Sequence, residues 1–165
     1  MKARTLGGLT ALAVLAIDHA AKLWLLYGLK LQENERIAVA PFLNFELRLN
    51  QGVSFSLFQQ QTAAGRWMLL GLTLVATLLL SIWLWRVVGV LAGLGLGAIV
   101  GGALGNGYDR FVYGAVVDFL DFHAFGYHFY VFNLADSAIT IGVILLLCDG
   151  LLGERRVGRT VDKEI

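Results

Sequence analysis

Four stretches of this sequence are long and apolar enough to cross a lipid bilayer, and no other feature constrains the fold as strongly. About 20 apolar residues in a helix span the hydrocarbon core. Only 15% of the residues are charged, against roughly 25% in soluble domains. We therefore predict an all-α membrane protein, folded as one domain over residues 1–165, with four transmembrane helices. These cover residues 6–29, 67–85, 87–105 and 131–152.

The segment between the first two spans has the period of a β-strand. Within residues 41–57, an apolar series alternates with a polar series, and the alternation resumes after Gly52. A period of two indicates a strand with one buried face. We expect a small extracytoplasmic β-sheet lying on the outer membrane surface; the alternative is an ordinary loop with no role in substrate binding. The polar series is Asn44, Glu46, Arg48 and Asn50.

Glycine recurs at every fourth position along the third predicted span. The series is Gly93, Gly97, Gly101 and Gly105. Such a row places hydrogen atoms instead of side chains on one helix face, so another backbone can approach closely. The Gly-Lys-Ser/Thr ending of a phosphate-binding loop is missing, which leaves helix packing as the predicted role.

The basic residues predict that both termini are cytoplasmic. With four spans the termini share one side of the membrane, and basic residues favour the cytoplasmic side. On this topology the inner segments hold more of them than the outer loops do. The inner ones are Lys2, Arg4, Arg86, Arg155, Arg156, Arg159 and Lys163; the outer ones are Lys30, Arg36, Arg48, Arg66 and Arg110.

Composition also limits the partners and cofactors. The net charge of +1, without a basic stripe, gives no indication of nucleic-acid binding. The lone Cys148 excludes an internal disulfide. The histidines lack the spacing of metal ligands, so we read them as packing or interfacial residues. We expect no metal, no cofactor and a monomer.

Polar residues gather between residues 101 and 136, in an otherwise apolar chain. Ionisable groups at membrane depth are costly, which makes them candidates for function. We predict that Asp118 and Asp136 form a catalytic pair at the outer edge of the bilayer. Two carboxylates that share one proton provide one acid and one base. The base activates water against a peptide carbonyl, and the acid stabilises the developing oxyanion.

Asp18 and Lys22 interrupt the first span four residues apart. This spacing puts them on one face of the helix, where they can form an ion pair. Two roles remain open from this pattern. The pair either supports the fold, or it belongs to the site directly, because buried charges are paired in both cases.

Five blocks of the sequence resemble, in order, the motifs of the signal peptidase II family of bacterial aspartic peptidases. They are Asp18-His-Ala-Ala-Lys22, Asn50-Gln-Gly52-Val-Ser-Phe55-Ser56, the segment from Gly101 to Arg110, Gly114-Ala-Val-Val-Asp118-Phe119, and Phe132-Asn133-Leu-Ala-Asp136-Ser137. The blocks extend over the four predicted spans, and the last three together are highly specific.

The resemblance implies an activity and a set of site residues. The enzyme would cut a diacylglyceryl-modified prolipoprotein just before its lipidated cysteine, in the bacterial inner membrane. Asp118 and Asp136 would be catalytic, and Asp18 and Lys22 would be structural support. The polar residues around the site would be Asn50, Gly52, Asn106, Asp109, Arg110 and Asn133.

The competing hypothesis is a membrane protein without enzymatic activity, such as a subunit of a proton-coupled transporter. Intramembrane acids and amides also serve proton relays. The sequence has no inverted repeat and no helix broken at the midplane, which makes transport the weaker hypothesis.

Overall fold

The structure is a computed structural model that describes residues 2–52 and 63–161. Among these residues, four helices are long and apolar enough to cross a membrane. The predicted all-α architecture with four spans is therefore confirmed, and the chain is a multi-pass membrane protein. Helix α1 covers Ala3–Leu23 and continues as a π-helical turn, η1, over Trp24–Gly28; α2 covers Ala63–Arg86, α3 covers Val90–Val112, and α4 covers Leu134–Val161.

Helix α3 is the centre of the bundle and contacts each of the other three helices. The glycine row explains its close contact with α1. A Cβ added at Gly93 would lie 2.7 Å from the carbonyl oxygen of Ala3, and one at Gly101 would lie 2.5 Å from that of Ala11. A second row faces α4, where a Cβ at Gly95 would lie 2.8 Å from the carbonyl oxygen of Gly142. The predicted packing role of the glycines is confirmed.

The bounds of the third span differ from the prediction. Helix α3 begins at Val90 instead of residue 87, and it continues to Val112 instead of ending at 105. The predicted span stopped at residue 105, just before the first polar side chains of this segment. Asn106 and Asp109 are instead buried inside the bundle, so α3 stays helical while it carries polar side chains.

The strands of the described residues form a four-stranded antiparallel sheet in the order β1-β2-β3-β4. Strand β1 covers Arg36–Ala40, β2 covers Leu43–Asn50, β3 covers Val116–Ala124 and β4 covers Tyr127–His128. The predicted strand at 43–50 is confirmed. The sheet is larger than predicted, because β3 and β4 come from the segment between the third and fourth predicted spans, where we predicted no strand. The part of the prediction at 53–57 lies outside the described residues.

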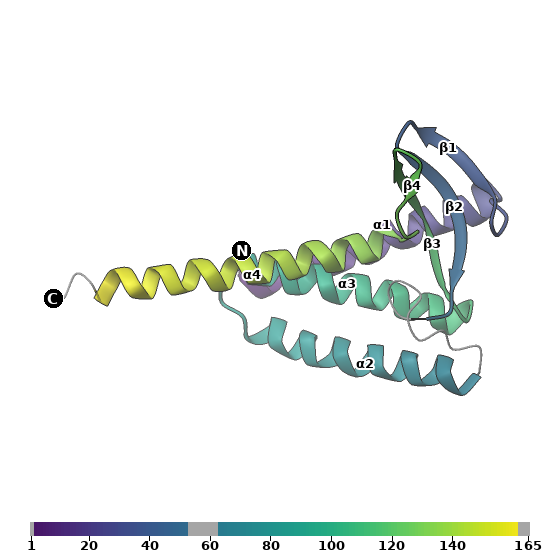
Figure 1. Cartoon of the computed structure of the whole chain (residues 1–165). Coiled ribbons are helices and arrows are strands. Elements are labelled where there is room, and N and C mark those ends of the chain that lie inside the picture. The colour runs from purple at the N-terminus through teal and green to yellow at the C-terminus, as the bar shows by residue number, and fades with distance from the viewer. Residues whose placement is uncertain (1, 53–62, 162–165) are drawn as a thin grey trace.

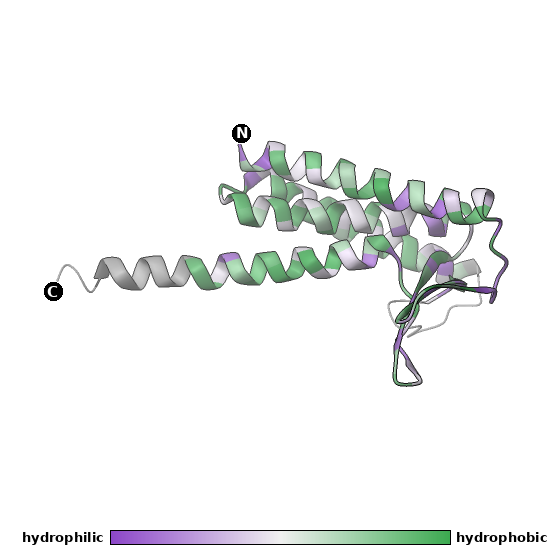
Figure 2. Cartoon of the chain, turned by 90° about the horizontal axis from the view of Figure 1, so that it is seen from above, coloured by the Kyte–Doolittle hydropathy of each residue, from purple (hydrophilic) through white to green (hydrophobic). Residues whose placement is uncertain are grey.

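One face of the sheet packs on the end of α1 (Figure 1). Its core consists of Leu25, Leu31, Leu47, Val117 and Phe119. The register places Asn44 opposite Asp121 and Arg48 opposite Asp118. The amide N–H groups of Phe119 and Leu120 both donate to the carbonyl oxygen of Phe132, which marks an irregularity in β3. The sheet lies across one end of the bundle, which we call the sheet end. Figure 2 shows hydrophilic residues of the helices toward this end and at the opposite end beside the N-terminus, with hydrophobic residues between them.

Candidate active site

A buried ion triad joins α1 to α3 below the sheet. The Nζ of Lys22 lies 2.7 Å from Asp18 Oδ2 and 2.7 Å from Asp109 Oδ2, and all three side chains are 1% exposed. Asp18 Oδ1 accepts the amide N–H of Ala135, and Asp109 Oδ2 accepts that of Val117. The predicted Asp18–Lys22 ion pair is confirmed. Asp109, which we predicted as a polar residue around the site, is the second partner of Lys22.

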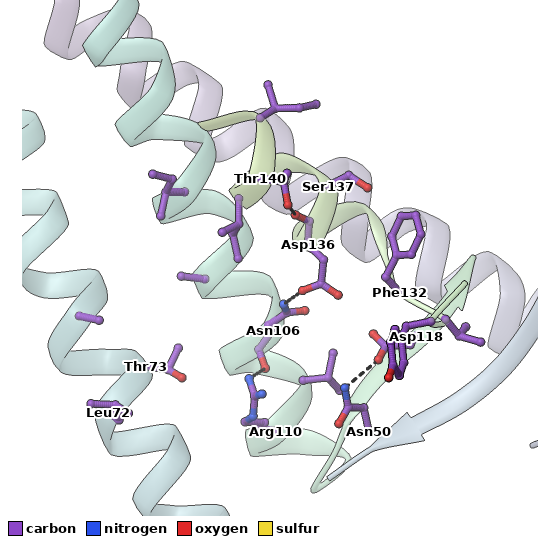
Figure 3. Close-up of a pocket in the computed structure, with 18 of the residues that line it drawn as sticks. Asn50, Leu72, Thr73, Asn106, Arg110, Asp118, Phe132, Asp136, Ser137 and Thr140 are labelled. Atoms are coloured by element: carbon purple, nitrogen blue, oxygen red, sulfur yellow. Dashed lines mark hydrogen bonds between the residues drawn. The ribbon is translucent and has the colours of Figure 1, made fainter. Parts of the chain in front are cut away.

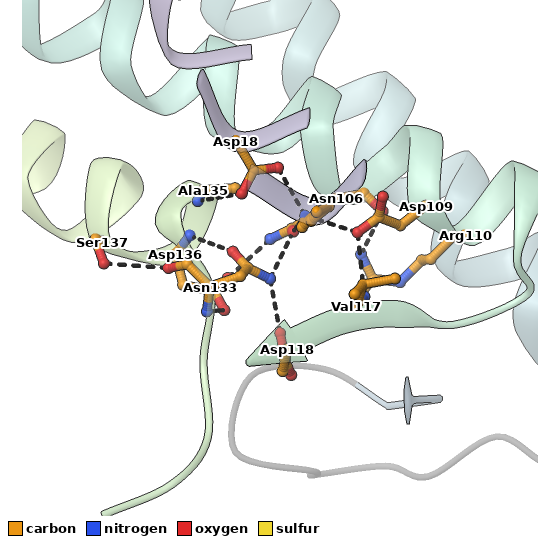
Figure 4. A network of polar contacts seen from close by, with 11 residues as sticks. Asp18, Asn106, Asp109, Arg110, Val117, Asp118, Asn133, Ala135, Asp136 and Ser137 are labelled. Carbon is orange, nitrogen blue, oxygen red and sulfur yellow. Dashed lines mark hydrogen bonds and ion pairs between the residues drawn. The ribbon is translucent and has the colours of Figure 1, made fainter. Parts of the chain in front are cut away.

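Two asparagines connect this triad to the predicted catalytic carboxylates. Asn106 Oδ1 lies 3.4 Å from Lys22 Nζ, and its Nδ2 donates to Asp136 Oδ1 at 2.8 Å. Asn133 Nδ2 donates to Asn106 Oδ1 at 3.1 Å and to Asp118 Oδ1 at 2.6 Å. These contacts fix both amides with their N–H groups toward the carboxylates, as Figure 4 shows.

Asp136 is held by the start of α4. Asn133 Oδ1 accepts the amide N–H of Asp136 at 2.9 Å, and Asp136 Oδ2 accepts the amide N–H of Asn133 at 3.4 Å. This reciprocal pattern is a capping box, formed here by asparagine and aspartate. The spacing of Asn133 and Asp136 therefore both starts the helix and sets the position of the carboxylate.

Asp118 lies on β3 and is 2% exposed. Its Oδ2 accepts the side-chain N–H of Asn50, from the end of β2, at 3.0 Å. Burial, together with the negative charge of Asp136, raises the pKa of Asp118 to about 7. Burial disfavours the charged form, and so does a nearby charge of the same sign. At neutral pH a large fraction of Asp118 therefore carries a proton.

Both carboxylates line a cavity of about 640 Å³ between α2, α3, α4 and the sheet (Figure 3). Asn50, Asn106 and Arg110 add polar groups to its wall. The remainder of the wall is mostly apolar, as in many ligand pockets. Its apolar part includes Leu72, Ala76 and Leu80 of α2, Ile99 and Ala103 of α3, and Ile139 and Ile141 of α4.

Arg110 joins the end of α3 to the segment after β2. Its Nη2 donates to the carbonyl oxygen of Gly52 at 2.9 Å, and the Gly52 amide donates to Asn50 Oδ1 at 2.9 Å. All the site residues that we predicted therefore belong to one connected polar network. They are Asp18, Lys22, Asn50, Gly52, Asn106, Asp109, Arg110, Asp118, Asn133 and Asp136.

Sequence reasoning missed a second polar cluster, on the sheet. Asp121 is 1% exposed and contacts Asn44 Nδ2 at 2.8 Å and His128 Nδ1 at 2.9 Å. Glu46 is 2% exposed and pairs with Arg36 and Arg48. The alternating polar series of β2 was the available signal, but its partners on β1 and β3 could not be identified without the strand register. His128, which we read as a packing or interfacial residue, pairs with Asp121.

Within the part of the chain that the structure describes, no group of three histidine, cysteine or acidic side chains has the geometry of a metal site. The arrangement of Asp118 and Asp136 is instead suited to acid–base chemistry, because both groups face one cavity and interact with each other.

Comparison with curated proteins finds relatives that are described as lipoprotein signal peptidases. This chain is 50% identical over 154 residues to the lipoprotein signal peptidase of Beijerinckia indica subsp. indica, covering 93% of this chain and 92% of the relative. It is 49% identical over 158 residues to the lipoprotein signal peptidase of Methylocella silvestris, covering 96% of this chain and 92% of the relative. It is 48% identical over 145 residues to the lipoprotein signal peptidase of Methylorubrum extorquens, covering 88% of this chain and 85% of the relative.

Solved structures and a family model agree with these relatives. Two structures of a bacterial membrane enzyme, determined by the in meso method at 2.3 and 1.9 Å resolution, superpose with TM-scores of 0.70 and 0.73. Each solved structure is 29% identical to this chain, and each match covers 88% of this chain. The match covers 87% of the first solved chain and 92% of the second. The model of the family described as signal peptidase (SPase) II matches residues 10–152. The chain belongs to the signal peptidase II family.

Proposed function

We propose that this protein is an aspartic endopeptidase that removes the signal peptide from diacylglyceryl-modified prolipoproteins, cutting just before the lipidated cysteine. One observation supports this proposal most strongly. Asp118 and Asp136 come from different elements, line the same cavity and are bridged by Asn133. The names of the curated relatives support the substrate class.

The charges and the cavity support one orientation in the membrane. We place the sheet end at the outer face of the bacterial inner membrane and both termini in the cytoplasm, as basic residues near Ala3 and Arg86 favour. The scissile bond then lies near the outer edge of the hydrocarbon region. The apolar wall of the cavity matches a substrate that carries a signal peptide and acyl chains.

The two carboxylates take different roles. Asp136, ionised, removes a proton from a water molecule, whose oxygen attacks the carbonyl carbon of the scissile peptide bond. Asp118, protonated, donates its proton to the carbonyl oxygen. The C–N bond of the tetrahedral intermediate then breaks, and the amine nitrogen takes the proton that Asp136 removed from water. The carbonyl re-forms as one hydroxyl proton passes back to Asp118, which restores the pair. No metal or cofactor takes part in this sequence.

The proposal is tested with purified protein in detergent and a synthetic prolipoprotein peptide that carries diacylglyceryl on its cysteine. We expect one cut before that cysteine, read by mass spectrometry, at an unchanged rate in the presence of chelator. The same peptide without the lipid should be cut poorly. A cut at another bond, or a strict need for metal, would contradict the proposal. The transporter hypothesis has no support from the relatives.

A further inference from the structure

The segment that runs from β3 through β4 toward α4 is aromatic and carries no formal charge. Residues 122–132 contain no aspartate, glutamate, lysine or arginine, and six of the eleven are phenylalanine or tyrosine. Phe125 is 102% exposed and Tyr127 is 83% exposed, so the described part of this chain does not cover their rings. Exposed aromatic side chains gathered in this way mark a surface that binds a partner or a membrane.

The turn between β3 and β4 holds a phenylalanine where the backbone does not favour one. Ala124 pairs with Tyr127, which leaves Phe125 and Gly126 as a two-residue turn. The backbone angle φ is 51° at Phe125 and 81° at Gly126. Positive φ at both central residues is the pattern of a type I′ turn, which prefers asparagine, aspartate or glycine. Turn chemistry therefore does not explain Phe125, and a bulky residue held at positive φ indicates a functional contact.

The hairpin has one polar face and one aromatic face, because successive side chains of a strand point to opposite sides. On the polar face His123 pairs with His128, and the centres of their rings lie 5.0 Å apart. His128 Nδ1 also contacts Asp121 Oδ1 at 2.9 Å. The aromatic face adjoins the turn, and we define the aromatic tip as Phe122, Phe125, Tyr127 and Phe129.

The aromatic tip lies close to the point where the chain enters the membrane. The apolar span of α4 begins at Leu134, five residues after Phe129. At most about 18 Å of extended chain separates these two residues. Figures 1 and 2 show the sheet extending sideways from the bundle beside the start of α4. The tip is therefore level with the surface of the bilayer that surrounds the helices.

We propose that the aromatic tip inserts into the phospholipid leaflet at the sheet end, with the ring of Phe125 among the acyl chains and Tyr127 at the level of the headgroups. Aromatic side chains are enriched at this boundary, and tyrosine can bury its ring while its hydroxyl stays near water. The histidines on the opposite face remain toward water. The contact holds β3, which also carries Asp118, at a fixed height in the bilayer. The inference does not depend on the proposed reaction.

A nitroxide label can measure the depth of the tip, because the chain has only one native cysteine to remove. In a Cys148→Ser background, Phe125→Cys is labelled and placed in phosphatidylcholine nanodiscs with one protein in each disc. Oxygen concentrates among acyl chains and a nickel chelate stays in water, so their collision rates with the label report its depth. We expect collisions with oxygen to exceed those with nickel at position 125.

Two other labelled positions calibrate the depth. Leu79→Cys, at an exposed position within the span of α2, should give the hydrocarbon value. Glu35→Cys, at an exposed position before β1, should collide more with nickel than with oxygen. A label at position 125 that behaves as at Glu35 would place the tip in water and overturn the inference. An oxygen preference found only in discs that hold two copies would assign the tip to self-association, which also overturns it.

A second measurement separates lipid contact from turn structure. Phe125→Asn supplies a residue that the type I′ turn prefers, whereas Phe125→Trp keeps an interfacial aromatic ring. The Phe129 amide donates to the carbonyl oxygen of Phe122 at 2.7 Å, so its hydrogen exchange reports opening of the hairpin. In nanodiscs, we expect exchange about tenfold faster in Phe125→Asn than in wild type, because burial of the phenyl ring is lost. Phe125→Trp should exchange as wild type does.

The outcome for Phe125→Asn decides between the two explanations. If its Phe129 amide exchanges as slowly as that of wild type, or more slowly, the phenyl ring makes no stabilising contact with lipid and the inference is wrong. Neither measurement uses a substrate. Failure of this inference would therefore leave the proposed function intact, and failure of the proposed function would leave this inference to be judged on its own.

Discussion

Two clusters of acids lie close together near the sheet end, and they differ in what neutralises them. Asp18 and Asp109 each lie 2.7 Å from Lys22 Nζ. Asp118 and Asp136 receive amide N–H groups from Asn50, Asn106 and Asn133 instead, and both face a cavity. A paired, enclosed carboxylate stabilises the fold, whereas a carboxylate held by neutral donors beside a cavity can exchange protons with a substrate.

The largest effect should come from the cavity pair. Asp118→Asn and Asp136→Asn each keep the shape of the side chain but remove proton transfer, which typically costs 100- to 10,000-fold in rate. We expect kcat to fall at least this far while the thermal unfolding midpoint changes little. Asp149→Asn, far from the site on α4, is the control and should keep full activity. Substantial cutting by either site variant would remove the catalytic assignment.

The enclosed triad should respond in the opposite way. Asp18→Ala leaves Lys22 with one carboxylate and the Ala135 amide without its acceptor, and breaking a buried ion pair costs about 3–5 kcal/mol. Denaturant unfolding should detect this loss, while activity per folded molecule stays within a few-fold of wild type. A variant with normal stability and no turnover would place Asp18 in the chemistry.

Helix packing around both clusters should show an intermediate effect. Gly101→Ala places a methyl group against the α1 backbone, and overpacking of this kind costs about 1–3 kcal/mol. Gly71→Ala is the matched control on α2, since an added Cβ there has no neighbour within 4 Å among the described residues. Equal stability of the two variants would contradict the close α1–α3 contact.

The smallest effect concerns the pH profile. Asp118 has a pKa raised to about 7, so it holds its proton below that pH and loses it above. If Asp118 is the acid, kcat/KM should decline as pH rises through about 7. The hydrogen bond from Asn50 lowers this pKa, so Asn50→Ala should move the decline to higher pH. If kcat/KM of Asn50→Ala declines at the same pH as that of wild type, the decline does not arise from deprotonation of Asp118, and the prediction is wrong.

The sequence predicts those parts of the molecule that depend on local spacing. The i, i+4 spacing gave the Asp18–Lys22 pair, the four-residue period gave the glycine row, and the two-residue period gave β2. Each of these patterns lies within one element, where helix or strand geometry alone relates the residues.

Contacts between elements could not be predicted in the same way. Asp109 pairs with Lys22 across two helices, and Glu46 joins arginines of β1 and β2. Strand β3 was hidden because its irregularity near Phe119 interrupts the alternation of apolar and polar residues. The third predicted span stops at residue 105, whereas α3 continues to Val112. Polar side chains that bind inside the bundle have the same sequence pattern as the end of a span at the membrane surface.

The most direct test measures both the activity and the stability of one variant from each cluster. Asp118→Asn and Asp18→Ala are purified in parallel, and each is assayed for kcat/KM on the lipidated peptide per folded molecule and for its free energy of unfolding. We expect Asp118→Asn to lose activity by at least about 100-fold with near-normal stability, and Asp18→Ala to lose stability with activity retained. The reverse pattern, or a parallel loss of activity and stability in both variants, would contradict this distinction between the clusters.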